Sequence, residues 1–482
     1  MNKQKNLLYW RRTKILATLG PASDSEKNIE SLIKAGVNVF RLNMSHGSHE
    51  QHSNSVKKIR KISKKLKSHT AILMDLCGPK IRVGKFKDGK INLKTRAKVS
   101  ISCTAKIGDV GLIVSQYKFL YKDVVKGNRI LLDDGNFELK VLRVENKDVI
   151  CEVIYGGELK DNKGMNLPDS IVSISSFTAK DKKDAELAIK EQVDFLALSF
   201  VREAKEVKSL NRFIKARGSD IPVISKIEKP EAVENINDIL RASYGIMVAR
   251  GDLGIELPAE KVPLIQKELI NRARCFNRPV IVATQMLESM ITNSRPTRAE
   301  VGDVANAALS SADAVMLSAE TASGKYPLKA VKTMDGILRE MEAHQWQRGR
   351  FGDVDYDEQD CGLASERRAI SHAVTSLSQE LKLQGIIVPT RSGSTAITLS
   401  ADRPTASLVG VCTDENICCR LSMHWGVIPY HIEKQVIKDW SKVCKDISAR
   451  TSILKTGRRV LLVSGFHDDA ALNMPVMKML SV

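Results

Sequence analysis

The stretch PVISKIEKPEAVENINDILRASYGIMVARGDLGIEL, residues 222–257, decides the fold class. It holds two short apolar runs, at 222–227 and 245–249, joined by a segment typical of a helix. Short runs that are apolar throughout are typical of parallel strands that are buried on both faces. The stretch is therefore predicted to form one strand–helix–strand unit of a parallel sheet.

The same alternation extends over much of the chain. Further apolar runs occupy residues 13–17, 37–42, 71–76, 195–200, 280–283 and 314–317, with amphipathic segments between them. Ser23 and Glu26 form a capping-box pattern, and Gly36 stands where the C-terminal cap of that helix belongs. About eight strand–helix units predict a (β/α)₈ TIM barrel, a fold that typically takes about 250 residues.

The chain of 482 residues is long enough for about three domains. Residues 85–178 are predicted to form short strands and turns, because apolar Phe137, Leu139 and Val141 alternate with polar residues and Asp133-Asp134-Gly135 is a turn. This β-rich insertion follows the third barrel strand, so it would lie over the end where barrel active sites form. A lid is expected, although position alone also allows an insertion without a function.

A third domain is predicted after the barrel. Residues 342–362 are polar and contain glycine, which is typical of a linker, and apolar runs return at 385–389, 407–412, 426–430 and 459–463. The expected domain limits are 1–84 and 179–345 for the two parts of the barrel, 85–178 for the lid, and 346–482 for a C-terminal open α/β regulatory domain.

Composition excludes several classes of protein. Hydrophobic residues make up 43% and charged residues 27%, which disfavours disordered, collagen-like and coiled-coil proteins. No run approaches the roughly 20 apolar residues of a membrane span, and the apolar stretch near the N-terminus is too short for a signal peptide. We therefore expect a cytoplasmic protein without a membrane partner. None of the nine cysteines lies in a C-x-x-C pair, so reduced thiols are expected.

The chain is strongly basic, with 75 Lys and Arg against 56 Asp and Glu and a net charge of +19. Such a balance fits nucleic acid, an anionic membrane or small anionic substrates. The densest run, VKKIRKISKKLK at 56–67, keeps apolar residues at helical spacing and so predicts an amphipathic helix with a solvated basic face. Only 5% of residues are aromatic, which is few for a surface that stacks bases. Nucleic acid is therefore disfavoured as a partner.

Polar side chains follow the predicted barrel strands at their carboxyl ends, where this fold places catalysis. They include the cations Arg41, Lys80, Arg82, Lys226 and Arg250 and the carboxylates Asp75, Glu228 and Asp252. A metal ion held by the two carboxylates of Glu228 and Asp252 would keep room for water and substrate oxygens, which suits Mg²⁺ or Mn²⁺. Nearby cations suit a phosphoryl group, whose transition state spreads charge over its oxygens. Singly, each residue also fits a surface ion pair or a helix cap; together they favour an anion and metal site.

Seven long stretches then resemble the pyruvate kinase family, in that family's order and over essentially the whole chain. They are RTKILATLGPAS at 12–23, NVFRLNMSHGS at 38–48, DLCGPKIR at 75–82, SKIEKPEAV at 225–233, VARGDLGIEL at 248–257, ATQMLESMITNSRPTRAEV at 283–301 and DAVMLSAETASGKYP at 313–327. The resemblance implies that phosphoenolpyruvate and ADP are converted to pyruvate and ATP. It also implies the same plan of barrel, lid and C-terminal domain, and a homotetramer.

The resemblance implies a role for each matching residue. Arg41 would hold the phosphoryl group, and Lys226 would stabilise its charge in the transition state. Mg²⁺ would bind Glu228 and Asp252, and a second Mg²⁺ would arrive with the nucleotide. The substrate carboxylate would lie on the N–H groups near Gly251 and Asp252, beside Thr284.

Two further groups of residues complete the implied site. The nucleotide contacts would be Asn43, His46, Arg82 and Lys180, the last on the strand that returns from the lid. The enolate would take its proton from Thr284 or from a water relay near Ser318 and Glu320, and the sequence does not choose between them.

The cation site departs from the family pattern. Many members hold K⁺ at positions matching Asn43, Ser45, Asp75 and the residue after it, and carry Glu where this chain has Lys80. Here the residue after Asp75 is Leu76, which offers no side-chain oxygen. The Lys80 ammonium is predicted to replace K⁺, so that K⁺ is not required. The alternative is that Lys80 points to solvent and K⁺ still binds.

A regulatory site is expected in the C-terminal domain. The loop of Thr390, Arg391, Ser392, Gly393, Ser394 and Thr395 resembles the family's effector-phosphate loop, and its hydroxyls and N–H groups suit a phosphate. The later loop at 465–469 carries His467 and two aspartates, and it lacks the Trp and Arg that hold a second phosphate in members activated by fructose 1,6-bisphosphate. The expected activator is a sugar monophosphate or AMP.

Two other functions stay open on the sequence. A metal-dependent barrel lyase or aldolase would share the Glu228 and Asp252 site but would not need a lid or ADP. A basic nucleic-acid-binding protein would show binding that weakens steeply with salt.

Overall fold

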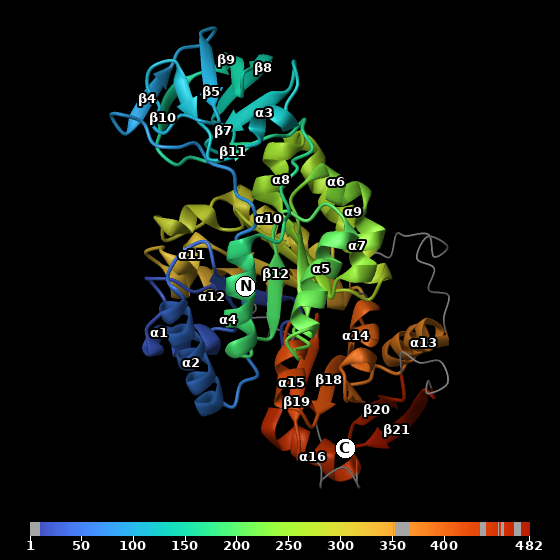
Figure 1. Ribbon diagram of the computed structural model, residues 1–482. Helices are drawn as coiled ribbons and strands as arrows, with labels where there is room; N and C mark the ends of the chain where they lie inside the picture. Colours follow the sequence, from blue (N-terminus) through green and yellow to red (C-terminus); the bar gives the residue numbers. More distant parts are fainter. Residues whose placement is uncertain are drawn as a thin grey trace.

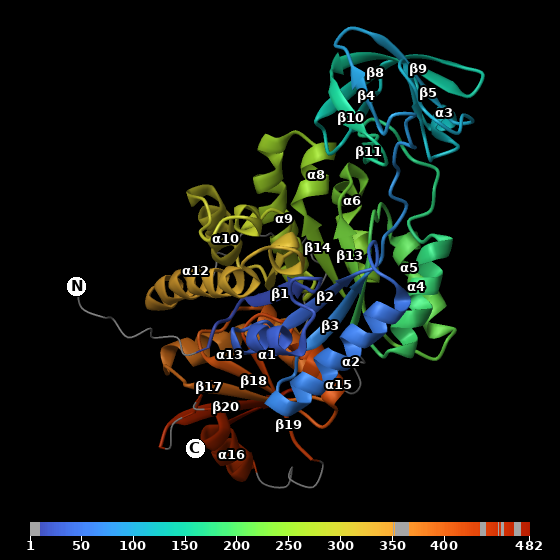
Figure 2. The ribbon, with the colours of Figure 1, turned by 90° about the vertical axis from the view of Figure 1, so that its left-hand side faces the viewer.

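The computed structural model describes residues 10–349, 351, 366–433, 440–451, 453–454, 457–466 and 474–482. A β-rich body and an α/β body lie at opposite ends of a central barrel (Figure 1). The view turned by 90° shows the same order, with the segment of residues 85–178 farthest from the C-terminus (Figure 2). The predicted three-part architecture is therefore confirmed.

The central barrel is closed and parallel, in the order β1-β16-β15-β14-β13-β12-β3-β2. Its strands are β1 (Lys14–Thr18), β2 (Val39–Asn43), β3 (Ala71–Asp75), β12 (Phe195–Leu198), β13 (Val223–Ile227), β14 (Gly245–Ala249), β15 (Val280–Ala283) and β16 (Ala314–Leu317). Nearly every residue of these strands is buried, because side chains fill the barrel on one face and pack against helices on the other. The TIM barrel predicted from the sequence is confirmed.

Helices cover the outside of the barrel. They are α1 (Glu26–Lys34), α2 (His49–Leu66), α4 (Ala179–Lys190), α5 (Ala204–Lys215), α6 (Pro230–Glu234), α7 (Ile236–Ala242), α8 (Arg250–Glu256), α9 (Val262–Cys275), α10 (Arg298–Leu309), α11 (Ala319–Ala322) and α12 (Pro327–Gln347). The basic face of α2 is partly neutralised, since Lys61 and Lys65 pair with Glu26 and Glu30 of α1 at 2.7 and 2.8 Å. This pairing supports the reading of α2 as an ordinary surface helix.

Two predicted helix boundaries were wrong. The N-cap of α1 is Ser25, whose hydroxyl accepts from Asn28 N–H, and Ser23 is not part of the cap. The Ser23 hydroxyl instead accepts a hydrogen bond from Gly20 N–H at 3.2 Å, so it is unavailable as a cap. Residues 342–347 belong to α12 and not to a linker, because buried Glu342 accepts hydrogen bonds from the N–H groups of Arg12 and Thr13. Residues 350 and 352–362 of the predicted linker lie outside the described residues.

The β-rich insertion has its own hydrophobic core. A two-stranded sheet pairs β4 (Lys90–Leu93) with β10 (Gly157–Lys160), and a six-stranded sheet has the order β11-β7-β8-β9-β5-β6. The latter contains β5 (Lys98–Ser102), β6 (Leu112–Val114), β7 (Arg129–Leu132), β8 (Phe137–Glu145), β9 (Asp148–Tyr155) and β11 (Met165–Asn166), with α3 (Leu120–Asp123) beside it. The predicted turn at 133–135 joins β7 to β8. We call this insertion the lid.

The two connections between lid and barrel lie close together. Gly78 on the outgoing connection has φ +63°, and a Cβ there would come within 2.8 Å of the Phe200 ring, so only glycine fits. Its N–H donates to Asp181 in the first turn of α4. Lys180 therefore lies on a helix and not on a returning strand, because Thr178 and Asp181 form a capping box that begins α4.

The C-terminal domain is an open sheet in the order β19-β18-β17-β20-β21. Its elements are β17 (Gly385–Pro389), β18 (Ser407–Cys412), β19 (Val427–His431), β20 (Arg459–Ser464), β21 (Val476–Ser481), α13 (Glu366–Glu380), α14 (Ser394–Ala401), α15 (Glu415–Leu421) and α16 (Trp440–Thr451). The sequence did not predict β21, an antiparallel edge strand, because its residues are mostly exposed and lack the pattern of a buried strand.

This domain packs against the amino ends of the barrel strands, opposite the lid. Buried Asp313, which precedes β16, accepts hydrogen bonds from the Arg403 guanidinium and from Trp425 N–H, both at 3.0 Å. Tyr244 and His424 also meet across this interface, with 2.7 Å between the Tyr244 hydroxyl and Nε2 of His424. The C-terminal domain thus contacts the amino ends of the barrel strands and leaves their carboxyl ends to the lid.

Two composition-based expectations can be compared with the structure. None of the helices in the described ranges combines the length and apolar character that a bilayer span requires. Seven cysteines of the described residues carry free thiols, but Cys275 is disulfide-bonded. The expectation of reduced thiols therefore fails at Cys275, since a disulfide depends on which side chains the fold brings together.

Candidate active site

Four charged side chains meet at the carboxyl ends of β2, β3 and β13. Arg41 on β2 donates from Nε to Oδ2 of Asp75 at 2.7 Å. The ammonium of Lys226 on β13 lies 2.9 Å from Oε1 of Glu228 and 3.5 Å from Oδ1 of Asp75. Lys226 and Glu228 project to the same side of the strand, as their spacing predicts. The strand ends thus collect two cations and two carboxylates within one network.

The network is almost dry. Asp75 and Glu228 are each 1% exposed. Burial alone would raise the pKa of Asp75, but Lys226 and Arg41 lower that pKa below its ordinary value. Burial alone would lower the pKa of Lys226, but Asp75 and Glu228 raise it above its ordinary value. The Lys226 ammonium and the Asp75 carboxylate are therefore both charged at neutral pH.

Glu228 and Asp252 have the properties of a divalent-cation site. Burial raises the pKa of Glu228 above its ordinary value, and the negative charge of Asp252 raises it as well. The Lys226 ammonium lowers this pKa but does not cancel the rise. Oε2 of Glu228 accepts from Phe200 N–H at 2.7 Å. Buried Oε1 accepts no hydrogen bond from the described residues, although the Lys226 ammonium is near. A divalent cation would relieve the repulsion between the two carboxylates, and their oxygens suit Mg²⁺ or Mn²⁺.

The protein supplies few further metal ligands. Across the described ranges, no group of three or more His, Cys, Asp or Glu side chains is placed to hold a metal ion. A cation at Glu228 and Asp252 would therefore take its other oxygens from water and substrate, as the two-carboxylate pattern predicts.

The helix α8 begins directly after β14 and carries Gly251 and Asp252 in its first turn. Thr284, just after β15, has a left-handed backbone with φ +68°. Its hydroxyl accepts a hydrogen bond from Gly251 N–H at 2.7 Å and donates to Ala283 O at 2.6 Å. A β-branched residue in this conformation costs roughly 1–3 kcal/mol, so the surroundings hold it there. The predicted substrate residues Gly251, Asp252 and Thr284 are thus brought together.

Most of the predicted nucleotide residues gather at the other side of the rim. The ammonium of Lys180 in α4 donates to the carbonyl of Met44 at 2.6 Å, directly after Asn43. His46 follows in the same loop and is exposed. Arg82 lies on the outgoing connection to the lid, where it forms a β-bridge with Gly164 of the lid.

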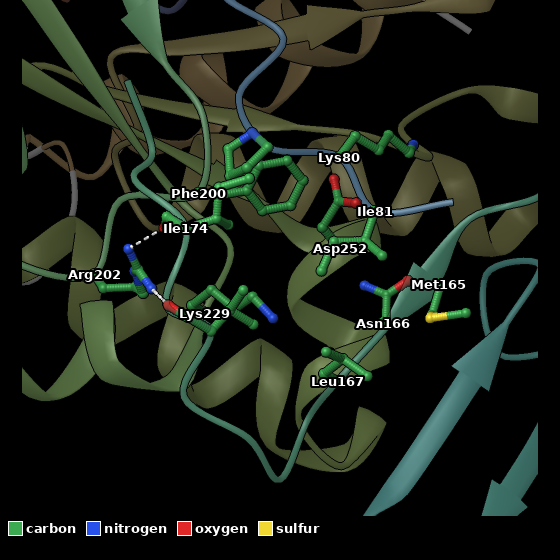
Figure 3. A pocket seen from close by; sticks show the side chains of 12 residues that line it. Lys80, Ile81, Met165, Asn166, Leu167, Ile174, Phe200, Arg202, Lys229 and Asp252 are labelled. Carbon is green, nitrogen blue, oxygen red and sulfur yellow. Dashed lines mark hydrogen bonds between the residues drawn. The ribbon is translucent and has the colours of Figure 1, made fainter. Parts of the chain in front are cut away.

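A cavity of about 40 Å³ separates the lid from the barrel rim (Figure 3). It is bounded by both lid connections, by β11 and by the rim. Asp252 and Lys229 line it from the barrel, Asn166 lines it from the lid, and Lys80 lines it from the outgoing connection. The lid therefore shares a cavity with Asp252, one of the two metal-ligand candidates.

Comparison with known proteins agrees with this geometry. The family model for the pyruvate kinase barrel domain matches residues 10–331, and that for the pyruvate kinase alpha/beta domain matches residues 368–478. This chain belongs to the pyruvate kinase family. Pyruvate kinases of Staphylococcus aureus strains MRSA252 and USA300 are 45% identical over 421 residues, which is 87% of this chain and 71% of each relative.

A solved structure extends the likeness to the whole chain. The crystal structure of a pyruvate kinase from Cryptosporidium parvum has a TM-score of 0.89 and 32% sequence identity, and covers 98% of this chain and 96% of that chain. The reaction of the pyruvate kinase family is phosphoryl transfer from phosphoenolpyruvate to ADP, giving pyruvate and ATP. Membership of this family rules out a lyase, an aldolase or a nucleic-acid-binding protein as the main function.

Two residues at the positions that match the potassium site of the pyruvate kinase family, Asp75 and Leu76, are placed unfavourably for binding K⁺. Asp75 already lies between two cations, and Leu76 is a buried apolar residue. Lys80 is exposed, and its Cε lies 4.0 Å from where a Cβ on Gly164 of the lid would stand. The Lys80 side chain thus extends along the lid in this structure.

The loop matching the pyruvate kinase effector site follows β17 and leads into α14. The Thr390 hydroxyl accepts from Gly393 N–H at 2.9 Å, and the Ser392 hydroxyl accepts from Ser394 N–H at 3.4 Å. Gly393 has φ +91°, which favours glycine at this tight turn. Of the second loop, residues 467–469 lie outside the described residues, so the expectation for His467 stays a prediction.

Sequence reasoning missed several residues beside the pyruvate kinase site. The Lys226 ammonium donates to the Ser199 hydroxyl at 2.8 Å, and the Arg41 guanidinium donates to the Thr18 hydroxyl at 3.1 Å. Ser199 and Thr18 lie at the ends of β12 and β1, so the strand-end rule would have found them had it been applied to these two strands. Glu320 was predicted near a water relay; both its oxygens accept backbone N–H groups, from Leu287 and Ser318.

Proposed function

We propose that the rim formed by β2, β3, β13, β14 and β15 binds phosphoenolpyruvate with a divalent cation, and that ADP enters between this rim and the lid. The observation that carries the proposed site is the network of Arg41, Asp75, Lys226 and Glu228, because it presents fixed charges at the strand ends of a chain in the pyruvate kinase family. The chain catalyses the reaction of that family, the transfer of the phosphoryl group from phosphoenolpyruvate to ADP.

Arg41 and Lys226 are the proposed phosphoryl-binding residues. Phosphoryl transfer spreads negative charge over three equatorial oxygens, so fixed cations stabilise its transition state more than its ground state. The Asp75 carboxylate contacts the side chains of Arg41 and Lys226 and fixes their positions before substrate binds. When bound at Glu228 and Asp252, Mg²⁺ or Mn²⁺ would neutralise phosphoryl charge as a Lewis acid.

Gly251, Asp252 and Thr284 are the proposed binding residues for the rest of phosphoenolpyruvate. The backbone near Gly251 would take the substrate carboxylate, although Thr284 now accepts the Gly251 N–H and would have to share it. Pyruvate formation needs a proton at the enolate carbon. The Thr284 hydroxyl and a water held near Ser318 and Glu320 remain the two candidate donors, and burial raises the pKa of Glu320 above its ordinary value.

Asn43, His46, Arg82 and Lys180 are the proposed nucleotide contacts. Arg82 lies on a lid connection and Lys180 lies in the helix to which the chain returns, so a moving lid would carry Arg82 toward or away from the other three. A closed lid would also exclude water, which would otherwise accept the phosphoryl group in place of ADP.

We propose that K⁺ is not required. Two cations already flank Asp75, and Leu76 offers no side-chain oxygen. Lys80 would complete the replacement by turning its ammonium from the lid toward Asp75 when substrates bind. In the alternative, the exposed Lys80 stays in solvent and K⁺ still binds, which predicts a K⁺-dependent rate for the native protein.

The decisive experiment is ADP-dependent pyruvate formation from phosphoenolpyruvate with Mg²⁺, in parallel buffers with and without K⁺. We expect equal rates in both buffers for the native protein. Lys80→Glu should restore the family pattern and make the rate dependent on K⁺. Formation only with K⁺ would keep the reaction and overturn the role of Lys80, and no formation in either buffer would overturn the proposed site.

Two further properties are proposed for the C-terminal part. A sugar monophosphate or AMP would bind the loop of Thr390, Ser392, Gly393, Ser394 and Thr395, and calorimetric titration with ribose 5-phosphate tests this. A homotetramer is supported by β21, an edge strand on which Val476 and Met477 are 56% and 44% exposed, since such an edge favours pairing with another chain. Sedimentation velocity tests the assembly. The domain limits 1–84, 85–178, 179–345 and 346–482 and a cytoplasmic location stay predictions.

A further inference from the structure

One buried carboxylate is contacted by both the lid and the barrel. Glu256 is the last residue of α8, and its side chain is 1% exposed. Its Oε1 accepts hydrogen bonds from the ammonium of Lys229 at 2.6 Å and from the side-chain amide of Asn166 at 3.0 Å. Asn166 lies on β11 of the lid and Lys229 on the barrel rim, and both line the cavity of Figure 3.

The ion pair of Lys229 with Glu256 joins the two elements that carry the proposed metal ligands. Lys229 directly follows Glu228, and Glu256 lies one helical turn after Asp252 on the same face of α8. The carboxylates of Glu228 and Asp252 repel each other, so these elements need an attraction to stay together without a metal. A buried ion pair supplies one, and removing either partner of such a pair is strongly destabilising.

The lid is tied to this ion pair through Asn166. Hydrogen bonds to an ionised acceptor are roughly twice as strong as those between neutral groups. Arg202 of the barrel also contacts this part of the chain, since its guanidinium donates to the carbonyls of Val172 and Ile174 on the returning connection. Arg202 therefore fixes the connection, whereas Asn166 belongs to the lid sheet itself. A rotation of the lid about its connections would break the contact between Asn166 and Glu256.

We propose that Glu256 is a positioning residue that latches the lid to α8, so that lid position and divalent-cation affinity are coupled. The proposal rests on the proposed function, in which Glu228 and Asp252 bind the cation. Glu256 keeps Lys229 when Asn166 leaves, so the lid opens without breaking the ion pair. A cation that holds Asp252 in place stabilises the docked lid, and a docked lid stabilises the cation site, because coupling between two sites is reciprocal.

The lid side is tested with Asn166→Ala in the full-length protein, with Asn92→Ala as the matched control. Asn92 is an exposed asparagine on β4 of the same lid. Asn166→Ala should be cleaved by trypsin at the lid connections at least threefold faster than the native chain. Its KM for ADP should rise three- to tenfold, with kcat and the KM for phosphoenolpyruvate within twofold. Equal behaviour of Asn166→Ala and Asn92→Ala would overturn the latch.

The metal side is tested by Mn²⁺ binding, measured by electron paramagnetic resonance without substrates. Glu256→Gln should bind Mn²⁺ three- to tenfold more weakly. Saturating Mn²⁺ should slow trypsin cleavage of the native lid at least twofold and leave the cleavage rate of Asn166→Ala unchanged. If Glu256→Gln fails to fold because Lys229 loses its partner, the double variant Lys229→Met, Glu256→Gln removes both charges and serves in its place.

Two outcomes separate the latch from the proposed function. Native Mn²⁺ affinity in the Glu256 variants, or equal slowing of cleavage by Mn²⁺ in Asn166→Ala, would overturn the coupling even in an active enzyme. Failure of the native protein to form pyruvate would overturn the proposed function, while the cleavage and Mn²⁺ measurements would still decide whether the lid is latched.

Discussion

Lys226 lies between the carboxylates of Asp75 and Glu228 and is the cation that the two carboxylates share. The ammonium lies 2.9 Å from the Glu228 carboxylate and 3.5 Å from the Asp75 carboxylate, and it also donates to the Ser199 hydroxyl. Asp75 and Glu228 are buried, so water could not solvate their charges if Lys226 were removed. A single side chain therefore serves both the stability of the rim and the charge of the proposed phosphoryl site.

Lys226→Met keeps the length of the side chain and removes its charge. Loss of one preorganised stabilising group typically lowers kcat by a factor of about 10²–10³, and loss of one partner of a buried pair costs about 3–5 kcal/mol of unfolding free energy. Steady-state kinetics and thermal unfolding would measure the two effects. Lys226→Arg, which keeps the charge, should lose less stability than Lys226→Met. A kcat within tenfold of the native value would contradict the role.

Single residues also mark how far the site could be predicted. Arg41, Asp75, Lys226 and Glu228 were found because parallel strands present their carboxyl ends at one rim, a rule that needs only the strand positions. The contact of Asn166 with Glu256 could not be found in this way. It joins a lid strand to the end of a barrel helix, and the orientation of one domain on another leaves no periodic pattern in the sequence.

At the scale of elements, α4 shows how a capping residue ties the lid to the barrel. The Thr178 hydroxyl accepts from Asp181 N–H, and the Asp181 carboxylate accepts from Thr178 N–H at 2.9 Å. The other oxygen of Asp181 accepts Gly78 N–H from the outgoing connection at 3.1 Å. One helix start thereby fixes both connections of the lid and places Lys180.

Thr178→Ala removes the hydroxyl cap of α4. An N-cap of this kind contributes typically about 1 kcal/mol, and we expect the free energy of unfolding to fall by that amount. Urea unfolding followed by circular dichroism would measure the loss. Thr178→Ser keeps a capping hydroxyl, so its free energy of unfolding should stay within about 0.3 kcal/mol of the native value. If both variants unfold at the same urea concentration, the cap does not stabilise α4.

Elements were predicted well where burial imposes a pattern. The positions of β14, β15 and β16 matched residue for residue, and the other barrel strands differed by at most two residues at each end. Failures came where patterns compete or are absent. Ser23 and Ser25 both fit the sequence pattern of an N-cap. Only the folded structure shows that the Ser23 hydroxyl accepts from Gly20 N–H instead. The exposed edge strand β21 has no buried face to signal it.

At the scale of the whole molecule, the interface between barrel and C-terminal domain contains a buried histidine. Burial lowers the pKa of His424 to about 4, with Asp313 opposing this shift and nearby cations adding to it. In the unfolded chain the pKa is about 6.5. The folded state therefore excludes a proton that the unfolded state binds between about pH 4 and 6.5. Its stability is complete above pH 6.5 and is lost as pH falls through this window.

This shift predicts a pH-dependent stability. The loss on going from pH 7 to pH 4 should reach roughly 3 kcal/mol from His424 alone, since one pKa unit corresponds to about 1.4 kcal/mol. His424→Gln removes the titrating group and keeps a hydrogen-bonding partner for Tyr244. Thermal unfolding at pH 7.5 and pH 5 should show a smaller difference for the variant than for the native chain. An equal change in unfolding temperature between the two pH values, in variant and native chain alike, would contradict the role of His424.

The insertion of the lid within the barrel has a consequence for how the chain acquires its fold during synthesis. In the closed sheet Lys14 pairs with Ala314, and Leu73 pairs with Phe195. A ribosome therefore delivers β1, β2 and β3 and then a complete domain before the next partner strand appears. The lid, contiguous in sequence and with a core of its own, is expected to fold during this wait, while two unpaired barrel edges stay exposed. Nascent chains that pause between residues 75 and 314 would accordingly be the species most in need of a chaperone.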